Sequence, residues 1–449
     1  MTRDTQDVQV VVMMGGVGSR LGSLVKDTPK PLLPVCGRPF FEYELDLLKA
    51  AGFRSFLFLT GYLSSEIEEC FGDGKSYGVE IRYRKDGTDE NGEPELLGTG
   101  GAIRNALDML EEDFLLVYAD SFMDIDYREA VCRYFSEKEK GALSLMTLLH
   151  NGGRFDKSNV IWRDGKIVLY DKNDPSPDMD YIDYGVNMFS RSVFDSYSEG
   201  AVFDLSEVQH SLSENGRLAG LVVDKRFYEI GRPESYKEFE IYAGERFETA
   251  RKAAFIDRDG VLNEIVYNED IEQLDSPLKQ DELKIIDGVR EAVDDLKAAG
   301  YYIFVVTNQP AAAKGKACLC DLYDVNSRLK ELIPGIDDIF VCFHHPKGSS
   351  RSTEKSLIRK CHCRKPGTGL ISQAQSKYLI DMSASFMAGD SFTDIECANA
   401  AGLKSVFVGD YKCDVCARLK FEKPDIIAPD LLTAAQMILK EDSIEKREN

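Results

Sequence analysis

Near the midpoint of the 449-residue chain lies the stretch Ala254-Phe255-Ile256-Asp257-Arg258-Asp259-Gly260-Val261, in which an apolar run leads two carboxylates into a glycine turn. A short, continuous apolar run is typical of a strand buried in a parallel sheet. Ligands of open α/β sheets bind outside the carboxyl ends of the strands, where Asp257 and Asp259 are expected. The stretch therefore predicts the first strand of a second α/β domain, and the residues before it are expected to form a separate unit.

Later segments predict further polar groups at the same sheet edge. One apolar run ends in Thr307-Asn308, and another ends in Gly389-Asp390, with Asp394 one helical turn further on. Between them, Cys363-Arg364-Lys365-Pro366 can bring a cation to this edge. Two acids, a hydroxyl or amide, a lysine and a further acid, in this order over residues 252–439, resemble the haloacid dehalogenase superfamily of phosphatases.

This resemblance implies a role for each polar group. Asp257 would be the nucleophile that becomes an aspartyl phosphate, and Asp259 would be the general acid and base. Mg²⁺, which prefers oxygen ligands, would be held by Asp257, the carbonyl of Asp259 and Asp390, with Asp394 in support. The groups expected to hold the phosphate and the rest of the substrate are Thr307, Asn308, Lys314, Arg364 and Lys365. The alternative is that acids after strands are only turn and helix-cap residues.

Cysteines and histidines predict a second metal site in the same domain. The chain carries Cys342-Phe343-His344-His345-Pro346, then a polar insert, then Cys361-His362-Cys363. Thiolate and imidazole groups at this spacing suit a closed tetrahedral Zn²⁺ site, which would order a loop that has no apolar core of its own. The expected ligands are Cys342, His344, Cys361 and Cys363, with His345 and His362 as alternatives. Surface thiols beside incidental histidines are the other interpretation.

The first half begins with an apolar run from Val8 to Met13, followed by Gly15-Gly16-Val17-Gly18-Ser19-Arg20-Leu21. Glycines let backbone N–H groups approach a polyphosphate, but this loop lacks the lysine and serine of a P-loop. Farther on come Thr28-Pro29-Lys30-Pro31 and Gly37-Arg38-Pro39. Together these motifs resemble the sugar-1-phosphate nucleotidylyltransferases, and the match extends to about Glu240.

By this second resemblance, Arg20 and Lys30 contact the triphosphate and the attacking sugar phosphate, and Lys172 steadies the sugar phosphate. Asp120 and Glu229 would bind Mg²⁺. The residues expected to lie against the nucleotide are Gly15, Gly16, Gly18, Arg20, Gly98, Thr99 and Gly101. The implied chemistry is in-line attack of a sugar 1-phosphate on the α-phosphorus of a nucleoside triphosphate, which depends on alignment and charge neutralisation. In the alternative interpretation, Asp120 is a turn residue and Lys172 a solvated surface charge.

The sequence departs from both family patterns at a few positions. Glu229 stands where the nucleotidylyltransferases usually have aspartate, and Met14 stands where a small residue is common. Pro310-Ala311 replaces a common Ser-Gly pair in the phosphatase pattern, and Ser391 replaces the usual lysine. The two transferase changes remove no charge, so activity is expected, while the phosphatase changes are expected to affect substrate affinity more than the nucleophile.

Composition excludes several classes of function. A content of 43% apolar and 29% charged residues is ordinary for a globular protein with two or three cores. A net charge of −22 disfavours nucleic acid or an anionic membrane as partner. No apolar run approaches ~18 residues, so no membrane-spanning helix is expected. Eleven cysteines without a signal peptide or a disulfide-like framework indicate a reducing cytoplasm.

We therefore expect two Rossmann-like α/β domains. Residues 1–248 would form a nucleotidylyltransferase domain with a GT-A-like mixed sheet, and residues 249–449 a haloacid dehalogenase-type parallel-sheet domain with a zinc-binding loop. Helices are predicted for Phe40 to Ala51 and for Glu234 to Lys252, a glycine loop opening a helix is predicted for Leu97 to Ala102, and the tail after Leu439 is expected to be frayed.

The motifs together predict consecutive steps on one metabolite. The cysteine-histidine cluster that runs into Arg-Lys-Pro resembles heptose 1,7-bisphosphate 7-phosphatases and the related histidinol-phosphate phosphatases, and the first half resembles heptose 1-phosphate guanylyltransferases. The expected product is GDP-heptose for a surface glycan, although no residue by itself specifies guanine. One alternative is a transferase for another hexose or aminosugar 1-phosphate, fused to a broad or histidinol-phosphate-type phosphatase. Another is a nucleotide-sugar-sensing module with one inactive half. The expected partners are small molecules, and no oligomeric state is predicted.

Overall fold

In the computed structural model, the described residues are 4–16, 19–25, 27–87, 97–268, 272–410 and 423–448. The chain divides into two compact units, Met1–Glu245 and Arg246–Asn449. The boundary between residues 248 and 249 stays a prediction for the functional domains.

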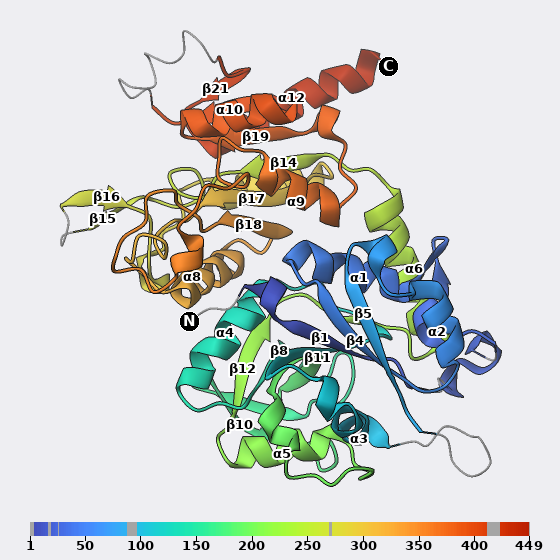
Figure 1. Ribbon diagram of the computed structural model, residues 1–449. Helices are drawn as coiled ribbons and strands as arrows, with labels where there is room; N and C mark the ends of the chain where they lie inside the picture. The colour runs from blue at the N-terminus through green and yellow to red at the C-terminus, as the bar shows by residue number, and fades with distance from the viewer. Residues whose placement is uncertain are drawn as a thin grey trace. The chain divides into compact units, whose positions relative to one another are not determined.

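The first unit is built on a mixed sheet, coloured blue to green in Figure 1. Its described strands are β1 (Gln9–Met13), β4 (Ser55–Thr60), β5 (Glu80–Lys85), β6 (Asp113–Tyr118), β8 (Ser144–His150), β9 (Val160–Arg163), β10 (Lys166–Tyr170), β11 (Tyr181–Ser190) and β12 (Leu218–Val223). The order is β10-β9-β11-β6-β1-β4-β5, and β8 pairs with β11 and β12. Strands β1, β4, β5 and β6 are parallel, whereas β11 is antiparallel to β6 and β8. The expected mixed sheet is confirmed.

Strand β1 lies inside this sheet, between β4 and β6, because its side chains are apolar on both faces. Val10, Val11 and Val12 are completely buried. The register sets Met13 opposite Tyr118, the last residue of β6. The glycine segment after β1 and the Asp120 segment after β6 therefore leave the sheet at the same edge.

The other elements of the first unit are short strand pairs and helices. The pairs are β2 (Pro34–Val35) with β3 (Arg38–Pro39), and β7 (Ser121–Phe122) with β13 (Tyr228–Glu229). The helices are α1 (Phe40–Ala51), α2 (Ser64–Phe71), α3 (Gly98–Asn105), α4 (Tyr127–Glu139), α5 (Leu205–Glu214) and α6 (Pro233–Ala243). Helix α1 has the predicted bounds, and it ends at Gly52, whose φ of 111° lets its N–H reach the carbonyls of the last turn.

The helix predicted for Glu234 to Lys252 ends earlier than expected. After α6, one π-helical turn spans Gly244–Glu248. The Arg251 N–H then donates to Leu379 O, and Arg251 forms a β-bridge with Ile380. Because the backbone of Arg251 pairs with this extended segment, it cannot continue the helix.

The second unit is built on a parallel sheet in the order β18-β17-β14-β19-β20-β21. These strands are β14 (Ala253–Ile256), β17 (Tyr302–Asn308), β18 (Asp338–Cys342), β19 (Phe386–Gly389), β20 (Lys404–Val408) and β21 (Ile426–Ala428). A separate hairpin contains β15 (Val266–Asn268) and β16 (Gln273–Asp275). The expected parallel-sheet domain is confirmed, and β14 is one of its two central strands.

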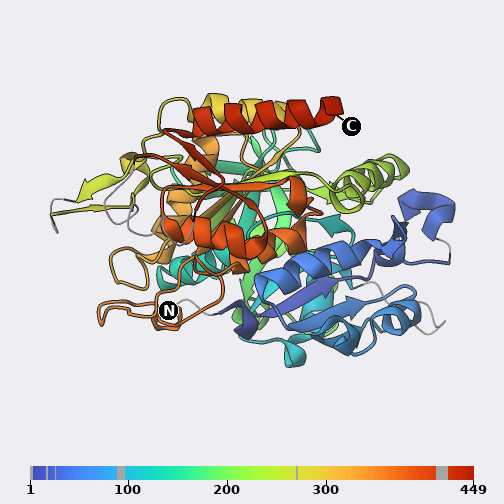
Figure 2. The ribbon, with the colours of Figure 1, turned by 90° about the horizontal axis from the view of Figure 1, so that it is seen from above.

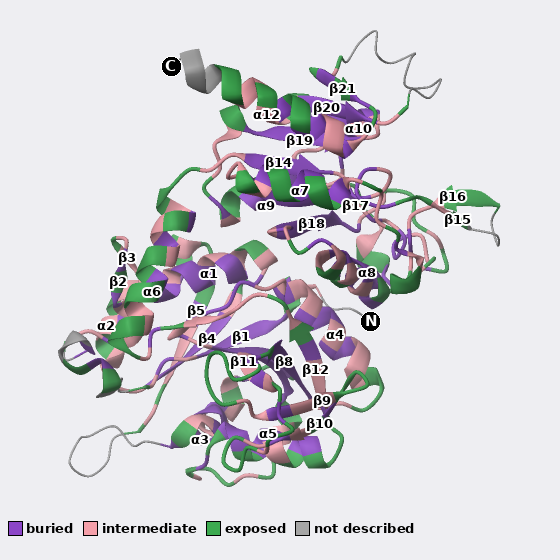
Figure 3. Ribbon diagram, turned by 180° about the vertical axis from the view of Figure 1, so that it is seen from behind, coloured by how far each residue is buried: buried purple, intermediate pink, exposed green. Residues whose placement is uncertain are grey.

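Helices cover both faces of this sheet. They are α7 (Val289–Ala298), α8 (Leu319–Leu332), α9 (Gly369–Lys377), α10 (Phe392–Ala401) and α12 (Leu431–Glu448). Helices α7 and α12 lie side by side on one face (Figure 2), and α9 and α10 lie on the other. Figure 3 shows the strands between them as buried, while the outer faces of the helices are exposed.

The tail after Leu439 was expected to be frayed, but through Glu448 it is the second half of α12. Its Asp442 carboxylate accepts a hydrogen bond from Tyr301 Oη at 3.0 Å and forms an ion pair with Lys252. These contacts anchor the helix. Of the helices in the described part of the chain, none is long and apolar enough to cross a bilayer.

Candidate functional site

Three neighbouring strands of the second unit bring the expected phosphatase groups to one sheet edge. Strand β14 leads into Asp257, β17 ends in Thr307-Asn308, and β19 leads into Asp390. Gly260 has a φ of 84°, and a Cβ there would lie 2.5 Å from Asp390 Oδ2. Only glycine lets the turn after β14 approach the Asp390 carboxylate this closely.

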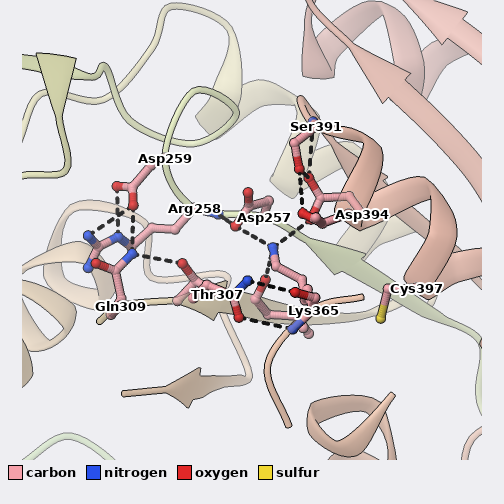
Figure 4. Close-up of polar contacts among 12 residues, drawn as sticks. Asp257, Arg258, Asp259, Thr307, Gln309, Lys365, Ser391, Asp394 and Cys397 are labelled. Carbon is pink, nitrogen blue, oxygen red and sulfur yellow. Dashed lines mark hydrogen bonds and ion pairs between the residues drawn. The ribbon is translucent and has the colours of Figure 1, made fainter. Parts of the chain in front are cut away.

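Lys365 connects two acids of this edge (Figure 4). Its Nζ lies 2.7 Å from Asp257 Oδ1 and 2.6 Å from Asp394 Oδ1, and it donates to Val306 O at 2.7 Å. The residue is only 3% exposed. Burial by itself opposes the charge, but the two carboxylates outweigh it and raise the pKa of Lys365. The lysine therefore stays protonated inside the protein.

The two acids beside Lys365 are held differently. Burial raises the pKa of Asp257, Asp394 and Asp259 add to the effect, and Lys365 opposes it. Asp394 is completely buried, and its Oδ2 accepts hydrogen bonds from Ser391 N at 3.1 Å and Ser391 Oγ at 2.6 Å. These bonds also cap the N-terminus of α10. Asp394 is thus fixed in place, while 13% of the Asp257 side chain is exposed.

The Asp259 carboxylate is surrounded by donors. It accepts from the Arg258 guanidinium at 3.0 and 3.3 Å, from Asn263 Nδ2 at 3.0 Å and from Gln309 Nε2 at 2.6 Å. Arg258 is itself completely buried, and its Nη1 donates to Asn326 Oδ1 at 2.9 Å. Burial alone would raise the pKa of Asp259, but Arg258 and these hydrogen bonds hold it below its ordinary value.

Three carboxylates form a group that suits a hard cation. Asp257, Asp390 and Asp394 each offer one oxygen, and these oxygens lie within 4.8 Å of one another. An all-oxygen donor set with several negative charges fits Mg²⁺. The Asp259 carboxylate is outside the group, so the contribution expected from Asp259 is limited to its main-chain carbonyl and stays a prediction.

The remaining substrate-binding candidates fall into two sets. The Asn308 side chain bonds the main chain of Lys365 twice, at 3.0 Å to its N–H and at 3.2 Å to its carbonyl, and Thr307 Oγ1 accepts from Gln309 Nε2 at 2.8 Å. Asn308 therefore positions Lys365. Lys314 and Arg364 lie close enough to interact: burial lowers the pKa of Lys314, and repulsion from Lys316 and Arg364 lowers it further.

The four expected zinc ligands converge. The Cys363 sulfur lies 3.3 Å from the sulfurs of Cys342 and Cys361, and His344 Nδ1 lies 3.2 Å from Cys363 Sγ. All four ligand atoms lie within 4.8 Å of one another. A tetrahedron with metal–sulfur bonds of about 2.3 Å has sulfur–sulfur edges of roughly 3.8 Å, so these three thiols and one imidazole fit a closed Zn²⁺ site. The alternative ligand His345 bonds the Lys347 carbonyl through Nδ1 instead.

In the first unit, the structure brings Lys30, Asp120 and Glu229 together. Lys30 Nζ lies 2.9 Å from Asp120 Oδ2. Strand β13 pairs Glu229 with Ser121, directly after Asp120, and Ile230 N donates to Asp120 O at 2.9 Å. Burial and the charge of Asp120 raise the pKa of Glu229, and Lys30 opposes this shift. Two acids and a lysine thus share one site.

The second glycine motif differs from its expected form. Gly98, Thr99 and Gly101 form the first turn of α3 and not a loop. The N–H groups of Gly100 and Gly101 donate to Phe203 O at 3.1 and 3.2 Å, and Thr99 Oγ1 accepts from Leu205 N at 2.9 Å. A Cβ on Gly100 would lie 2.3 Å from the Phe203 ring. Close packing on the segment before α5 therefore explains these glycines, and their contact with a nucleotide stays a prediction.

The remaining residues expected to bind the transferase substrates come from two other segments of the first unit. Gly15 and Gly16 follow β1, Arg20 is exposed in the 3-10 turn Ser19–Val25, and Gly18 lies outside the described residues. Lys172 is close enough to Asp183 and Asp204 to lower the pKa of both carboxyls, although burial raises that of Asp183 to about 6 overall.

Sequence reasoning missed the polar network around Asp259. Arg258, Asn263, Gln309 and Asn326 hold this acid or its partner, and each is more than nine-tenths buried. One signal was available: Arg258 stands between two acids in the motif after β14, where an arginine is close enough to pair with either.

Comparison with known proteins relates each of the two units to a protein family. A family model described as nucleotidyl transferase matches residues 9–240. The chain belongs to the nucleotidyl transferase family. A D-glycero-alpha-D-manno-heptose 1-phosphate guanylyltransferase of Campylobacter jejuni is 28% identical to this nucleotidyl transferase over 234 residues, which are 52% of this chain and 99% of the relative.

The second unit contains a match to a HAD-hydrolase-like family model at residues 362–434. A D-glycero-beta-D-manno-heptose-1,7-bisphosphate 7-phosphatase of Rhodopseudomonas palustris is 36% identical over 157 residues, 34% of this chain and 81% of the relative. A D-glycero-alpha-D-manno-heptose-1,7-bisphosphate 7-phosphatase of Photorhabdus laumondii is 37% identical over 164 residues, 35% of this chain and 81% of the relative. The chain is thus a fusion of a nucleotidyl transferase with a HAD-type phosphatase, and both families generally use Mg²⁺.

Proposed function

We propose that this nucleotidyl transferase fusion catalyses two consecutive steps of nucleotide-activated heptose synthesis. The second unit removes the 7-phosphate of D-glycero-α-D-manno-heptose 1,7-bisphosphate, and the first unit transfers GMP from GTP to the resulting heptose 1-phosphate. The α anomer is proposed because the transferases of Campylobacter jejuni and Aneurinibacillus thermoaerophilus are both named for it, whereas phosphatase relatives are named for either anomer. The observation that carries the proposal is the Asp257–Lys365–Asp394 arrangement in a chain that also belongs to the nucleotidyl transferase family.

In the phosphatase step, Asp257 attacks the phosphorus of the 7-phosphate. Lys365 Nζ and Arg258 N both contact Asp257 Oδ1, so we assign the attack to Oδ2. Asp259 donates a proton to the leaving sugar oxygen and then removes one from the water that hydrolyses the aspartyl phosphate. Because Asp259 starts ionised among four donors, it must first leave some of them and gain a proton. Lys365, Lys314 and Arg364 balance the charge of the two phosphate groups.

The three-carboxylate group formed by Asp257, Asp390 and Asp394 would hold Mg²⁺. When bound, this ion supplies charge neutralisation for the phosphoryl oxygens.

In the transfer step, an oxygen of the heptose 1-phosphate attacks the α-phosphorus of GTP, and pyrophosphate leaves. Lys30 and Arg20 balance the charge of the phosphates, and Lys172 orients the sugar phosphate. Asp120 and Glu229 would hold Mg²⁺, since the charges of their carboxylates interact with each other and with Lys30. Catalysis in this step rests on alignment and charge neutralisation.

The Cys342–His344–Cys361–Cys363 cluster would hold a structural Zn²⁺ that orders the segment between β18 and α9. We place the enzyme in the cytoplasm, where such thiols remain reduced.

The experiment supplies purified full-length protein and Mg²⁺ with each anomer of heptose 1,7-bisphosphate and, separately, with each of the four common nucleoside triphosphates. Products are followed by mass spectrometry, and mannose 1-phosphate and histidinol phosphate serve as competing substrates. We expect phosphate release followed by GDP-heptose with GTP only. Asp257→Asn should abolish phosphate release but still convert supplied heptose 1-phosphate, and Asp120→Asn should do the reverse. Preference for histidinol phosphate or for mannose 1-phosphate would overturn the proposal.

A further inference from the structure

Gln309 is a completely buried residue that directly follows β17. Its Nε2 donates to Asp259 Oδ2 at 2.6 Å and to Thr307 Oγ1 at 2.8 Å (Figure 4). Its main-chain N–H donates to Cys342 O at 2.8 Å, which fixes the backbone beside β18. Gln309 Oε1 has no hydrogen-bond partner among the described residues. One amide nitrogen thus connects an acid of the proposed reaction to a hydroxyl group of the same sheet edge.

The Asp259 carboxylate determines which way this amide is turned. Asp259 also accepts hydrogen bonds from the Arg258 guanidinium and from Asn263 Nδ2, so its recorded side-chain contacts are all with donors. Such a set of donors stabilises the ionised acid. If the Gln309 amide were turned over, its oxygen would lie against Asp259 Oδ2 with no hydrogen between them. The ionised acid therefore holds the amide with its nitrogen toward Asp259 and Thr307.

This orientation determines where the Thr307 hydroxyl hydrogen can go. The amide nitrogen has two hydrogens, and it gives one to Asp259 and one to Thr307 Oγ1. Because Thr307 Oγ1 accepts in this contact, its own hydrogen is not used there. In the described part of the chain, no acceptor is recorded for that hydrogen, and Thr307 is only 1% exposed. The hydrogen is therefore available to an acceptor that enters the site.

The Thr307 hydroxyl stands at the edge of the sheet where the proposed nucleophile lies. Strand β17 is parallel to β14, which leads into Asp257. Lys365 Nζ lies 2.7 Å from Asp257 Oδ1 and donates at 2.7 Å to the carbonyl of Val306, the residue before the threonine. A phosphoryl group at Asp257 brings acceptor oxygens to this edge, and a buried hydroxyl with a hydrogen to give is a suitable partner for them.

We propose that Gln309 is a positioning residue for phosphate binding. By donating to Thr307 Oγ1, it keeps the hydroxyl hydrogen of Thr307 directed at the phosphoryl group, and Asp259 keeps the Gln309 amide in the orientation that does this. The inference rests on the proposed phosphatase step, in which Asp257 receives the phosphoryl group. One side chain then aligns both the acid and base of this step and a phosphate-binding hydroxyl.

The test measures the affinity of the full-length protein for inorganic phosphate, in the presence of Mg²⁺, by titration calorimetry. Thr307→Val removes the hydroxyl at nearly constant shape and should weaken binding roughly 10-fold, as expected for one hydrogen bond to a charged group. Thr307→Ser keeps the hydroxyl and should bind phosphate like wild type. All substitutions lie in the second unit, so the differences among them report on the phosphatase site.

Asp259→Asn tests the orientation of the amide. The asparagine oxygen stays with Arg258 and Asn263, and its NH₂ group faces Gln309, whose amide turns over to accept from it. Gln309 Oε1 then lies against Thr307 and takes its hydrogen. In the Asp259→Asn background, we therefore expect Thr307→Val to change phosphate affinity by less than about 2-fold. Adding Gln309→Leu removes the competing oxygen and should restore the effect of Thr307→Val.

Two results would overturn the proposal. One is an effect of Thr307→Val that is as large in Asp259→Asn as in wild type, and the other is no restoration by Gln309→Leu. A merely structural role of Gln309 predicts neither the loss of the effect nor its return. Gln280→Leu, at an exposed amide that donates to Asp324 O, is the matched control and should leave phosphate affinity unchanged.

A further variant keeps the proposal testable if Asp259→Asn does not fold. Gln309→Glu offers only acceptor oxygens, so it takes the Thr307 hydrogen in either orientation and should also suppress the effect of Thr307→Val. An undiminished effect in that background would contradict the proposal. If wild type binds phosphate but releases none from heptose 1,7-bisphosphate, the proposed function fails, and the same variants still decide the role of Gln309. If wild type binds no phosphate, the inference about Gln309 is wrong.

Discussion

Lys365 and Asp257 form a buried ion pair, with 2.7 Å between Nζ and Oδ1, at the edge of the parallel sheet. The same ammonium group lies 2.6 Å from Asp394, so a single cation separates two acids. A lysine in this position offsets the repulsion between the two acids. It serves stability and the proposed reaction at once.

Lys365→Met should therefore impair both. The change leaves two neighbouring carboxylates without their cation, and loss of one partner from a buried pair destabilises a protein by about 3–5 kcal/mol. Denaturant unfolding of the full chain and phosphate release measure the two effects. The matched control is Lys404→Met, which removes a partly exposed pair with Glu441 at 2.7 Å and should cost less than about 1 kcal/mol. Equal effects of the two variants would show that the buried pair is not special.

Gln309→Leu should move the part of the pH–rate profile set by Asp259 to higher pH. The amide donates to Asp259 Oδ2 at 2.6 Å and is one of the contacts that lower the pKa of this acid. Without it the ionised form loses a partner, so the pKa rises, and the direction is the same whether Asp259 limits the rate as acid or as base. Phosphate release across pH measures the shift. Gln280→Leu, whose amide bonds only a carbonyl of α8 among its described contacts, is the control and should leave the profile in place.

Removal of the proposed zinc should unfold part of the second unit and spare the first. Cys361→Ser deletes one of the converging ligands, and structural zinc sites contribute folding free energy directly, so we expect a loss of more than about 3 kcal/mol. Elemental analysis should find one zinc per chain in wild type and almost none in the variant. Cys70→Ser, a half-buried thiol of the first unit, should retain the metal. A metal-free wild type with full phosphatase activity would refute this site.

Gly100→Ala should destabilise the first unit even without substrate. The added Cβ would lie 2.3 Å from the Phe203 ring, and such overpacking costs about 1–3 kcal/mol. Gly244→Ala is the comparison, since its backbone is helical and a Cβ there meets nothing within 4 Å. That variant should be neutral or slightly more stable. Thermal unfolding of both proteins tests whether the α3 glycines are needed for packing.

Much of the fold could be predicted because a strand that is buried on both faces has a continuous run of apolar residues in the sequence. Strands β1 and β14 are of this kind, and α1 was predicted to the residue because its apolar face and its flanking Pro39 and Gly52 mark both ends. The mixed and parallel sheets followed from the order of such runs and of the family motifs. The glycines at the start of α3 were predicted to form a loop. Their packing partner Phe203 is about a hundred residues away in the sequence, and no local sequence pattern predicts that contact.

The candidate site was predictable where its residues follow strands, and less so where they do not. Asp257 and Asp390 stand at the ends of β14 and β19, so sheet topology alone brings them together. Asn326 lies inside α8 and looks like an ordinary surface residue until folding sets it against Arg258. The functional roles of all these residues remain predictions, and the variants described above are the means to test them.

The contact of Lys252 with Asp442 joins the residue before the first strand of the second unit to its last helix. Within the second unit, strand β14 is translated before its neighbours β17 and β19, and α12 is translated after them. Because the first unit precedes all of these elements in the chain, we expect it to fold before the phosphatase edge is complete. During synthesis, we therefore expect the unit that acts second in the proposed reaction order to be assembled first.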